Sequence, residues 1–252
     1  RFIVFLRPLG LRLDFGTSYS YKMPVSSMLA GKLPVTGLLT GMSFVLILAF
    51  SIPLGIFTAR HAGGRLDRAM TAVNQALMAI PAFVTGILLT YVFGLVLRWF
   101  VPGNYVSPGD NFGGSLWYFL FPAVSIALPR VAMTVKMLRS SILSELQKDY
   151  VRTSHSRGNS DRSTLYRHVL RNAMGPVVSF LAMTVADIVA GSVVIEQVFS
   201  LPGLGRMLLT SIANRDYPVV QAVVVIVAFW VVLVNLLADL INQRLDPRLR
   251  LT

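Results

Sequence analysis

Five long stretches of apolar residues constrain this chain more than any other feature of its sequence. They cover residues 33–59, 69–100, 116–138, 174–199 and 218–241. A helix needs about 20 apolar residues to cross the hydrocarbon core of a bilayer, and each stretch is long enough. Only 13% of the residues are charged, which is roughly half the share found in soluble domains. The sequence therefore predicts an all-α fold, a polytopic bundle of transmembrane helices.

Three prolines lie inside these stretches, at positions 53, 81 and 129. Proline lacks a backbone N–H, and its ring clashes with the preceding turn of a helix. The carbonyl freed by such a kink is tolerated only against neighbouring helices or a water-filled cavity. We therefore expect Pro53, Pro81 and Pro129 each to kink the helix that contains it.

Basic residues are unevenly divided among the connecting loops. Regions 60–68, 139–171 and 244–252 carry three, seven and three Lys or Arg residues, whereas 101–115 and 200–217 carry none and two. Because cytoplasmic loops are rich in Lys and Arg, the first three regions are predicted to be cytoplasmic. We expect an external segment at 1–32, a transmembrane domain at 33–241 with a cytoplasmic loop at 139–172, and a cytoplasmic tail at 242–252. Five basic residues before position 33 conflict with this orientation.

The net charge of +12 and the absence of cysteine limit the remaining classes. The basic residues fall in loops between apolar stretches and do not cluster beside aromatic residues, which argues against nucleic-acid binding. Without cysteine the chain has no disulfide, thiolate metal site or thiol nucleophile. The histidines His61, His155 and His168 are far apart and lack metal-ligand spacing, so we expect no metal site. There is no Gly-x-Ser-x-Gly elbow either, and we expect no catalytic residue.

The loop at 139–172 contains a long, basic and regular segment. Gly158 separates two stretches compatible with helices, and Asn159 or Ser160 can cap the second, with Asp161 in its first turn. That second stretch can place apolar residues on one face and basic residues mainly outside it: Leu165, Val169 and Leu170 against Arg162, Arg167 and Arg171. Such a helix either docks in a groove of a soluble partner or lies on anionic lipid headgroups. The pattern alone favours neither alternative.

The loop and the residues that follow it contain the segments Asp149-Tyr-Val-Arg-Thr, Gly158, Arg167-His-Val-Leu-Arg-Asn-Ala173 and Pro176. These segments resemble the cytoplasmic "EAA" motif of ABC importer permeases, most closely in the dipeptide, oligopeptide and nickel branch. Two further matches are Glu196-Gln-Val-Phe-Ser-Leu-Pro-Gly-Leu-Gly-Arg206 and Asn214-Arg-Asp-Tyr-Pro-Val-Val-Gln221, with a third in the tail at Leu245-Asp-Pro-Arg248. Ser154-His155-Ser156 departs from the branch pattern. The branch has six spans, so we expect a missing upstream helix or a short variant.

The resemblance implies roles for two groups of residues. In the coupling loop (residues 139–172) it implies contact with an ATPase by Asp149, Tyr150, Arg152, Gly158, Ser160, Asp161, Arg162, Leu165, His168, Arg171 and Asn172. In the outer loop (residues 196–217) the candidates for an external gate are Glu196, Phe199, Pro202, Gly203, Gly205, Arg206, Arg215, Asp216 and Tyr217. The outer loop can equally be a hairpin that only packs.

The resemblance also implies partners and a mechanism. A second permease, usually non-identical, completes the pore, two cytoplasmic ABC ATPases dock on the coupling loops, and an external binding protein delivers the solute. The solute is a short peptide, or alternatively a nickel chelate, glutathione, haem or an opine. We expect a bacterial or archaeal inner-membrane protein with no cofactor and no enzymatic activity of its own. The competing classes are a secondary transporter or channel that works without an ATPase, and a membrane scaffold.

Asp187 lies well inside the fourth apolar stretch. A charge at mid-membrane costs about 2.5–3.5 kcal/mol on the insertion scale. Asp187 therefore either lines the solute path or pairs with a base on a neighbouring helix. Both interpretations stay open.

The predicted orientation can be tested by labelling. Single cysteines introduced at His155 and at Gly109 should react from opposite sides of the membrane, and the printed chain has no cysteine that would interfere. Membrane-impermeant thiol reagents applied to intact cells and to inverted vesicles make the comparison. Labelling of both positions from outside would contradict the orientation.

Overall fold

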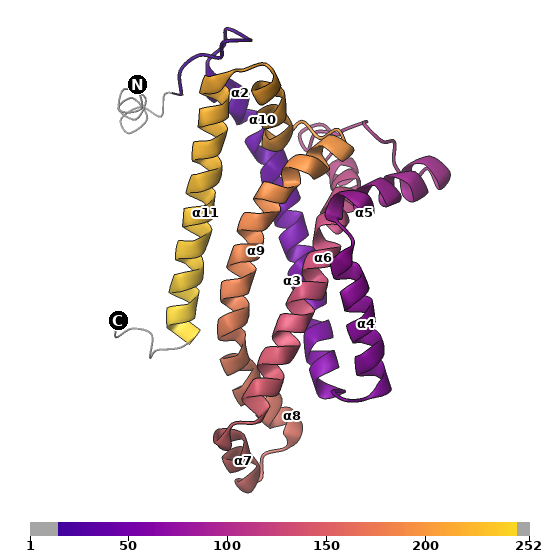
Figure 1. The fold of residues 1–252 in the computed structure, drawn as a ribbon, viewed down its shortest axis with the longest axis vertical. Coiled ribbons are helices and arrows are strands. Elements are labelled where there is room, and N and C mark those ends of the chain that lie inside the picture. The colour runs from indigo at the N-terminus through magenta and orange to yellow at the C-terminus, as the bar shows by residue number, and fades with distance from the viewer. Residues whose placement is uncertain (1–14, 246–252) are drawn as a thin grey trace. The chain divides into compact units, whose positions relative to one another are not determined.

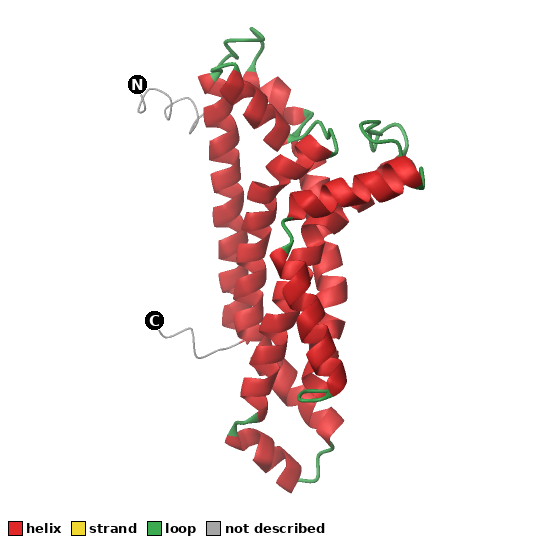
Figure 2. Ribbon diagram, turned by 45° about the vertical axis from the view of Figure 1, so that its right-hand side comes forward, coloured by secondary structure: helices red, strands yellow, loops and turns green. Residues whose placement is uncertain are grey.

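The computed structural model describes residues 15–245, and its regular structure there is helical (Figure 1). The one exception is an isolated antiparallel β-bridge between Thr17 and Pro24. Loops and turns connect the helices, as the colouring of Figure 2 shows. The predicted segment 1–32 is thus described only from Phe15, and the tail motif that begins at Leu245 lies outside the described side chains.

The helices are joined by short connections, except for the longer loop 97–111. In chain order they are α2 (Val25–Ala30), α3 (Leu33–Arg60), α4 (Arg65–Ala79), α5 (Ala82–Leu89), α6 (Phe112–Leu146), α7 (Asp149–Ser156), α8 (Asp161–Thr164), α9 (Leu170–Val198), α10 (Leu204–Ala213) and α11 (Tyr217–Leu245). Two segments have π-helical hydrogen bonding: η1 (Thr90–Val96) after α5 and η2 (Leu165–Val169) after α8.

Four helical runs are long and apolar enough to cross a membrane. They are Val25–Arg60, Phe112–Leu146, Asp161–Val198 and Tyr217–Arg244. These runs correspond to the first, third, fourth and fifth predicted stretches and confirm a polytopic helical membrane protein. The first begins at Val25 rather than at residue 33, because α2 leads into it.

The second predicted stretch is interrupted at Pro81. The prediction that Pro81 kinks one continuous helix is therefore wrong. Helix α4 ends at Ala79, and α5 starts only at Ala82, so a fifth span exists only if both helices are counted together. Ile80 is extended, with φ −88° and ψ 119°, because the residue before a proline is pushed out of the helical region. By contrast, Pro53 lies inside continuous α3, and the helix α6 likewise continues through Pro129.

The described residues divide into two compact units, and the first comprises 15–43, 82–126 and 187–231. In this unit α2 and α10 pack with the start of α11 around one apolar cluster. Its buried members are Val25, Leu29, Leu204, Met207, Val219, Ala222 and Val223. The unit also contains the outer loop.

The second unit comprises 44–81, 127–186 and 232–245. Its parts of α6 and α9 are joined by the hydroxyl of Ser141, which donates to the carbonyl of Ala173 over 2.8 Å. Helix α3 approaches α6 closely at Gly55, where a Cβ would lie 2.8 Å from Cδ2 of Leu138. Since Leu138 is fully buried, its side chain has little room to move. This unit contains the coupling loop.

Replacing Gly55 by alanine should therefore destabilise the protein. Gly41 lies in the same helix and would meet nothing within 4 Å, so Gly41→Ala is the matched control. Both changes gain about 1 kcal/mol of helix propensity, and only Gly55→Ala crowds Leu138. We expect Gly55→Ala to melt at a lower temperature than Gly41→Ala in detergent. Equal melting temperatures would contradict the close approach of α3 and α6.

Candidate functional site

The coupling loop forms a helical hairpin whose turn is set by Gly158. Gly158 has φ +79°, a conformation that glycine adopts without the steric cost paid by other residues. Its N–H donates to the carbonyl of His155 over 2.8 Å, and the N–H of Asn159 donates to that of Ser154 over 3.3 Å. A Cβ at Gly158 would meet nothing within 4 Å. The backbone conformation at this position therefore favours glycine, whereas the space around it would admit a side chain.

Ser160 is the residue that caps the second helix of the hairpin. Its hydroxyl accepts a hydrogen bond from the backbone N–H of Ser163 over 3.3 Å, and Asp161 follows in the first turn. A hydroxyl at this position satisfies a backbone donor that has no partner within the helix. Of the two predicted alternatives, Ser160 and not Asn159 is the cap.

A buried polar clip holds the two arms of the hairpin together. The hydroxyls of Ser154 in α7 and Thr164 in α8 are 3.0 Å apart, and the side-chain amide of Asn159 donates to Ser154 over 3.1 Å. Ser154 and Thr164 are 7% and 1% exposed. Sequence analysis missed both roles. Ser154 lies three residues after the buried Val151, on the same face of α7, and this spacing was the available signal.

The second arm is not the separate short helix that the sequence suggested. Helical structure continues from Asp161 through η2 into α9, and the whole run Asp161–Val198 has the length and apolarity of one span. Nothing between Asp161 and Val198 resembles the interruption at Ile80 and Pro81. The docking candidates after Gly158 therefore sit at the start of a membrane helix.

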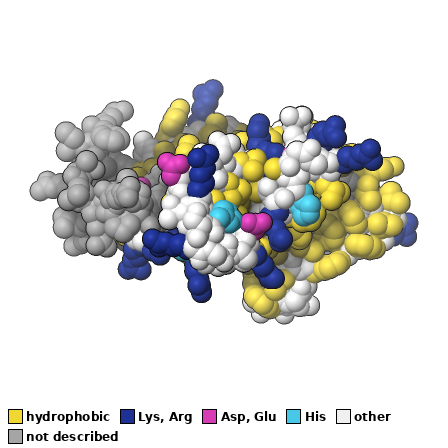
Figure 3. All heavy atoms as spheres, turned by 90° about the horizontal axis from the view of Figure 1, so that it is seen from below, with side chains coloured by type: hydrophobic (Ala, Val, Ile, Leu, Met, Phe, Trp, Pro, Cys, Tyr) yellow, Lys and Arg dark blue, Asp and Glu magenta, His cyan; other side chains and the backbone are white. Residues whose placement is uncertain are grey.

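Most of the predicted docking residues are exposed. Those with exposed positions are Asp149, Arg152, Gly158, Ser160, Asp161, Arg162, His168, Arg171 and Asn172, whereas Tyr150 is half-buried and Leu165 is buried. Figure 3 looks onto the end of the molecule where Figure 1 places α7 and α8, and Lys and Arg side chains are spread over this face. In the coupling loop seven Lys or Arg residues outnumber three Asp or Glu residues, so a partner that docks here meets a surface with a net positive charge.

Tyr150 ties the start of α7 to the end of α6. Its hydroxyl donates to a carboxylate oxygen of Glu145 over 2.8 Å. Burial is the main cause that raises the pKa of the Tyr150 hydroxyl, and the hydrogen bond to Glu145 acts in the same direction. Tyr150 therefore stays protonated and keeps donating at physiological pH.

An ion pair that the sequence did not reveal anchors the first residue of the coupling loop. Arg139 donates to Asp67 in a bidentate arrangement, with Nε–Oδ1 and Nη2–Oδ2 distances of 2.8 and 2.6 Å. Asp67 is 5% exposed and also accepts from the backbone N–H of Gly63 over 2.9 Å. Charge-assisted bidentate pairs are strong and directional. The predicted cytoplasmic loop 60–68 is thereby fixed to α6.

In the outer loop, a fully buried carboxylate joins three helices. Glu196, near the end of α9, is 0% exposed and accepts from the hydroxyl of Thr36 in α3 over 2.7 Å and from the N–H of Arg206 in α10 over 2.9 Å. Thr36 in turn accepts from the N–H of Leu204 over 2.8 Å. Two N–H groups of the first turn of α10, which have no partner within that helix, are thus satisfied.

Gly203 and Gly205 make room for this carboxylate. A Cβ at Gly203 would overlap the carboxyl group of Glu196, and one at Gly205 would overlap Cα of Val193 and lie 3.0 Å from Oε2 of Glu196. Both glycines are buried. Their small size lets α10 begin directly against α9.

Phe199 belongs to an aromatic cluster of the same unit. Its carbonyl accepts from the hydroxyl of Tyr118 over 2.6 Å, and its ring lies 6.2 Å from that of Phe100. Phe100 also stacks on Phe121 at 4.3 Å. Phe199 is 1% exposed, so it holds the loop 97–111 against the outer loop.

Asp216 fixes the segment before α2 to the end of the outer loop. It is 1% exposed and accepts hydrogen bonds from the hydroxyl of Ser18 and from the backbone N–H groups of Tyr19 and Ser20. Burial by itself raises the pKa of Asp216, but these hydrogen bonds outweigh it and hold the pKa below the usual value. Asp216 therefore stays ionised at neutral pH.

The structure thus separates the predicted outer-loop residues into two groups. Glu196, Phe199, Gly203, Gly205 and Asp216 are buried and hold segments together. Four others are partly or fully exposed: Pro202, Arg206, Arg215 and Tyr217. Ser18 and Thr36, which satisfy the two buried carboxylates, were missed because they lie 198 and 160 residues away from them.

The predicted solute-path residue is a member of α9. Asp187 has an exposed side chain in this chain. Within residues 15–245, no group of three or more His, Asp or Glu side chains is placed to hold a metal ion.

The dependence of the two glycines on Glu196 can be measured with a double-mutant cycle. Gly203→Ala should lower the melting temperature because the added Cβ displaces the carboxylate of Glu196. In a Glu196→Ala background the same change should lower the melting temperature much less. Gly205→Ala should stay destabilising in both backgrounds, because it also meets the backbone of Val193. Residues in contact typically couple by 0.5–3 kcal/mol, so an interaction energy of about this size is expected for the Gly203 cycle.

Gly191→Ala is the control for this cycle. Gly191 lies in α9, the helix of Glu196, and a Cβ there would meet nothing within 4 Å. Additive effects of the changes at Gly203 and Glu196, measured by thermal unfolding, would contradict the contact between them.

The chain is similar to several known membrane transport proteins. Residues 51–251 match the family described as the binding-protein-dependent transport system inner membrane component. The oligopeptide transport system permease protein AppB of Bacillus subtilis is 35% identical over 99% of this chain and 80% of its own length. A probable peptide ABC transporter permease of Sinorhizobium fredii is 33% identical over 95% of this chain and 77% of its own length. A nickel import system permease of Staphylococcus aureus is 32% identical over 96% of this chain and 70% of its own length.

Solved structures agree on the fold. A chain of the MetNI methionine ABC transporter in an inward-facing conformation has a TM-score of 0.70 at 16% identity, with 88% of this chain and 97% of that chain covered. A chain of an amino acid ABC transporter has a TM-score of 0.60 at 15% identity, with 87% of this chain and 94% of that chain covered. The sequence match covers most of the chain and agrees with the helical membrane fold, and the chain therefore belongs to the binding-protein-dependent transport system inner membrane components, the permease subunits of ABC importers.

Proposed function

We propose that this chain lines the translocation path for short peptides in the inner membrane of a bacterium or archaeon. The support for peptides is that two of its relatives, each at least 33% identical, carry peptide or oligopeptide transport in their names. The nickel permease at 32% identity keeps a nickel chelate as the second candidate solute. Mass spectrometry of the ligand that co-purifies with the external binding protein distinguishes the two.

The proposed complex contains a second, non-identical permease chain, two cytoplasmic ABC ATPases and an external solute-binding protein. Asp187 is proposed to line the solute path, and the outer loop to gate it on the external side. ATP hydrolysis is assigned to the partner chains. A phosphate-binding loop needs Gly-Lys followed by Ser or Thr, whereas the Gly31-Lys32 pair of this chain is followed by Leu33.

The observation that carries the proposal is the capped, clipped hairpin of the coupling loop. Its turn is fixed by Gly158, its second helix is capped by Ser160, and Ser154 and Thr164 bind its arms together. Shifting a transporter between states from 1:99 to 99:1 takes about 5.5 kcal/mol of differential binding. A docking element must be rigid to transmit energy of that order, and the buried hydrogen bonds supply the rigidity.

The coupling role can be tested at Gly158. Gly158→Val should abolish or strongly reduce solute-stimulated ATPase activity and uptake in proteoliposomes, because a β-branched residue does not tolerate φ +79°. Gly158→Asn is the matched control: asparagine adopts this conformation more readily, and it should retain most of the activity. Membrane insertion of both variants should be normal.

Two results would contradict the proposal. Full solute-stimulated ATPase activity in Gly158→Val would remove the coupling role of the turn. Uptake by the purified chain without any ATPase, driven by an ion gradient, would point instead to a secondary transporter.

A further inference from the structure

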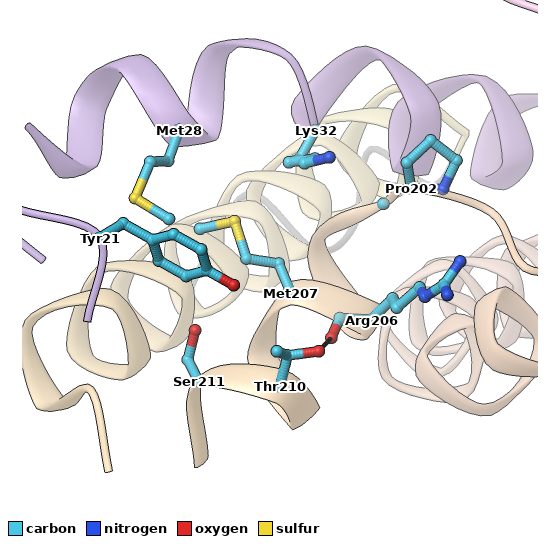
Figure 4. Close-up of a pocket in the computed structure, with 9 residues that line it drawn as sticks. Tyr21, Met28, Lys32, Pro202, Arg206, Met207, Thr210 and Ser211 are labelled. Carbon is cyan, nitrogen blue, oxygen red and sulfur yellow. Dashed lines mark hydrogen bonds between the residues drawn. The ribbon is translucent and has the colours of Figure 1, made fainter. Parts of the chain in front are cut away.

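A cavity of about 370 Å³ lies between the segment at Tyr21, helix α2 and helix α10. All its lining residues belong to the first compact unit. They are Tyr21, Met28, Lys32, Pro202, Gly203, Arg206, Met207, Thr210 and Ser211 (Figure 4). The cavity is on the predicted external side of the membrane, and its volume lies at the small end of the range of ligand pockets, which leaves ample room for one amino-acid side chain.

The charged residues that line this cavity are both basic. Lys32 and Arg206 come from different elements, and the lining contains no Asp or Glu. Among residues 15–245 neither cation forms an ion pair. Arg206 donates through Nη1 to the carbonyl of Ser200 over 2.9 Å, which steadies its guanidinium and leaves further N–H donors for a ligand.

The other end of the cavity is mainly apolar. Figure 4 shows Met28, Met207 and the ring of Tyr21 on this side, together with the hydroxyl of Ser211, and Lys32 and Arg206 on the other side. Methionine side chains adapt their shape to what packs on them. The cavity therefore fits a negatively charged group that is carried on a short apolar stem.

The carboxylate of Glu196, which lies against Gly203 of the cavity wall, forms no ion pair with either cation. It lies behind Gly203 and is 0% exposed, and its oxygens take hydrogen bonds from Thr36 and from the N–H of Arg206. Its hydrogen bonds hold α10 in place, so Glu196 supports the cavity wall while the side chains of Lys32 and Arg206 remain available.

Exposed apolar side chains are found next to the cavity-lining residues in the same elements. Tyr21 itself is 52% exposed, and the neighbours in sequence with similar exposure are Tyr19, Met23, Leu209 and Ile212. Tyr, Met and Arg are enriched in protein–protein interfaces relative to the rest of a protein surface. Such side chains next to the lining residues can add apolar contacts to a protein partner that places a charged group between Lys32 and Arg206.

We infer that the cavity receives a carboxylate side chain of a protein partner on the external side, between Lys32 and Arg206, with apolar contacts from that partner to the surrounding tyrosines and methionines. The inference rests on the proposed function, in which the external solute-binding protein is that partner. It assigns to this cavity a docking role beyond the general gating proposed for the outer loop.

The charge preference of the cavity can be measured without any partner. A cysteine at Thr210, on the lining, should react faster with an anionic methanethiosulfonate (sulfonatoethyl) than with a cationic one (trimethylammonium-ethyl), by a ratio on the order of tenfold. Using both reagents on one thiol cancels differences in its own reactivity. Lys32→Gln or Arg206→Gln should bring this ratio down toward that of Ala213→Cys, which is exposed in the same helix but not on the lining.

Partner binding is measured on the assembled transporter in nanodiscs with its purified solute-binding protein. Arg206→Gln should weaken binding about tenfold or more and reduce its salt dependence, since it removes one of the two cations that hold the docked carboxylate. Arg215→Gln is the matched control, because Arg215 is an exposed cation of the same loop that does not line the cavity. Equal dissociation constants for wild type and Arg206→Gln would overturn the inference.

The source of the carboxylate is settled by protection of the Thr210→Cys thiol. Saturating solute-binding protein should slow its labelling, whereas free dipeptide or anionic lipid in the nanodisc should not. Protection by dipeptide or by anionic lipid alone would overturn the docking role. A wild-type complex that shows neither uptake nor stimulated ATPase activity would instead count against the proposed function. The ratio of labelling rates does not depend on uptake or on ATPase activity, so the two failures can be told apart.

Discussion

A backbone that lies in hydrocarbon must satisfy its N–H and C=O groups without water, and the rest of this structure depends on that constraint. An unsatisfied group costs several kcal/mol in lipid, so the apolar stretches can only be helices. Irregular backbone at membrane depth is tolerated only where other groups supply the bonds. The start of α10 shows how: the N–H groups of Leu204 and Arg206 are taken by Thr36 and Glu196.

Buried carboxylates provide these bonds repeatedly. Glu196 serves the outer loop, Asp216 holds the segment at Ser18, and Asp67 holds Arg139 and the turn at Gly63. Each carboxylate accepts at least one backbone N–H, which offsets the cost of removing it from water. Side chains from distant positions thereby fix the loops, so the exposed residues of these loops sit on rigid supports.

The sequence predicted the elements that depend on local composition. Hydropathy found four of the spans. The pattern around Gly158 predicted the turn of the hairpin and limited its cap to Asn159 or Ser160, because turn and cap both depend on neighbouring residues. The pair Thr36–Glu196, separated by 160 positions, had no local signal. Hydropathy also could not tell a kink from an interruption at Pro81, although the polar residues Arg65, Asp67, Arg68 and Asn74 distinguish α4 from the apolar α5. The docking and path roles remain predictions.

The interruption at Ile80 and Pro81 has a consequence for how the chain enters the membrane. The apolar part that follows it, Ala82–Val96, has 15 residues in α5 and η1, a length of about 22 Å as a regular helix. The hydrocarbon core is about 30 Å thick, so this segment is too short to be recognised as a span by the translocation machinery without help from its neighbours. Biogenesis should therefore be most fragile here, and substitutions in this segment should appear as degraded protein rather than as an inactive transporter.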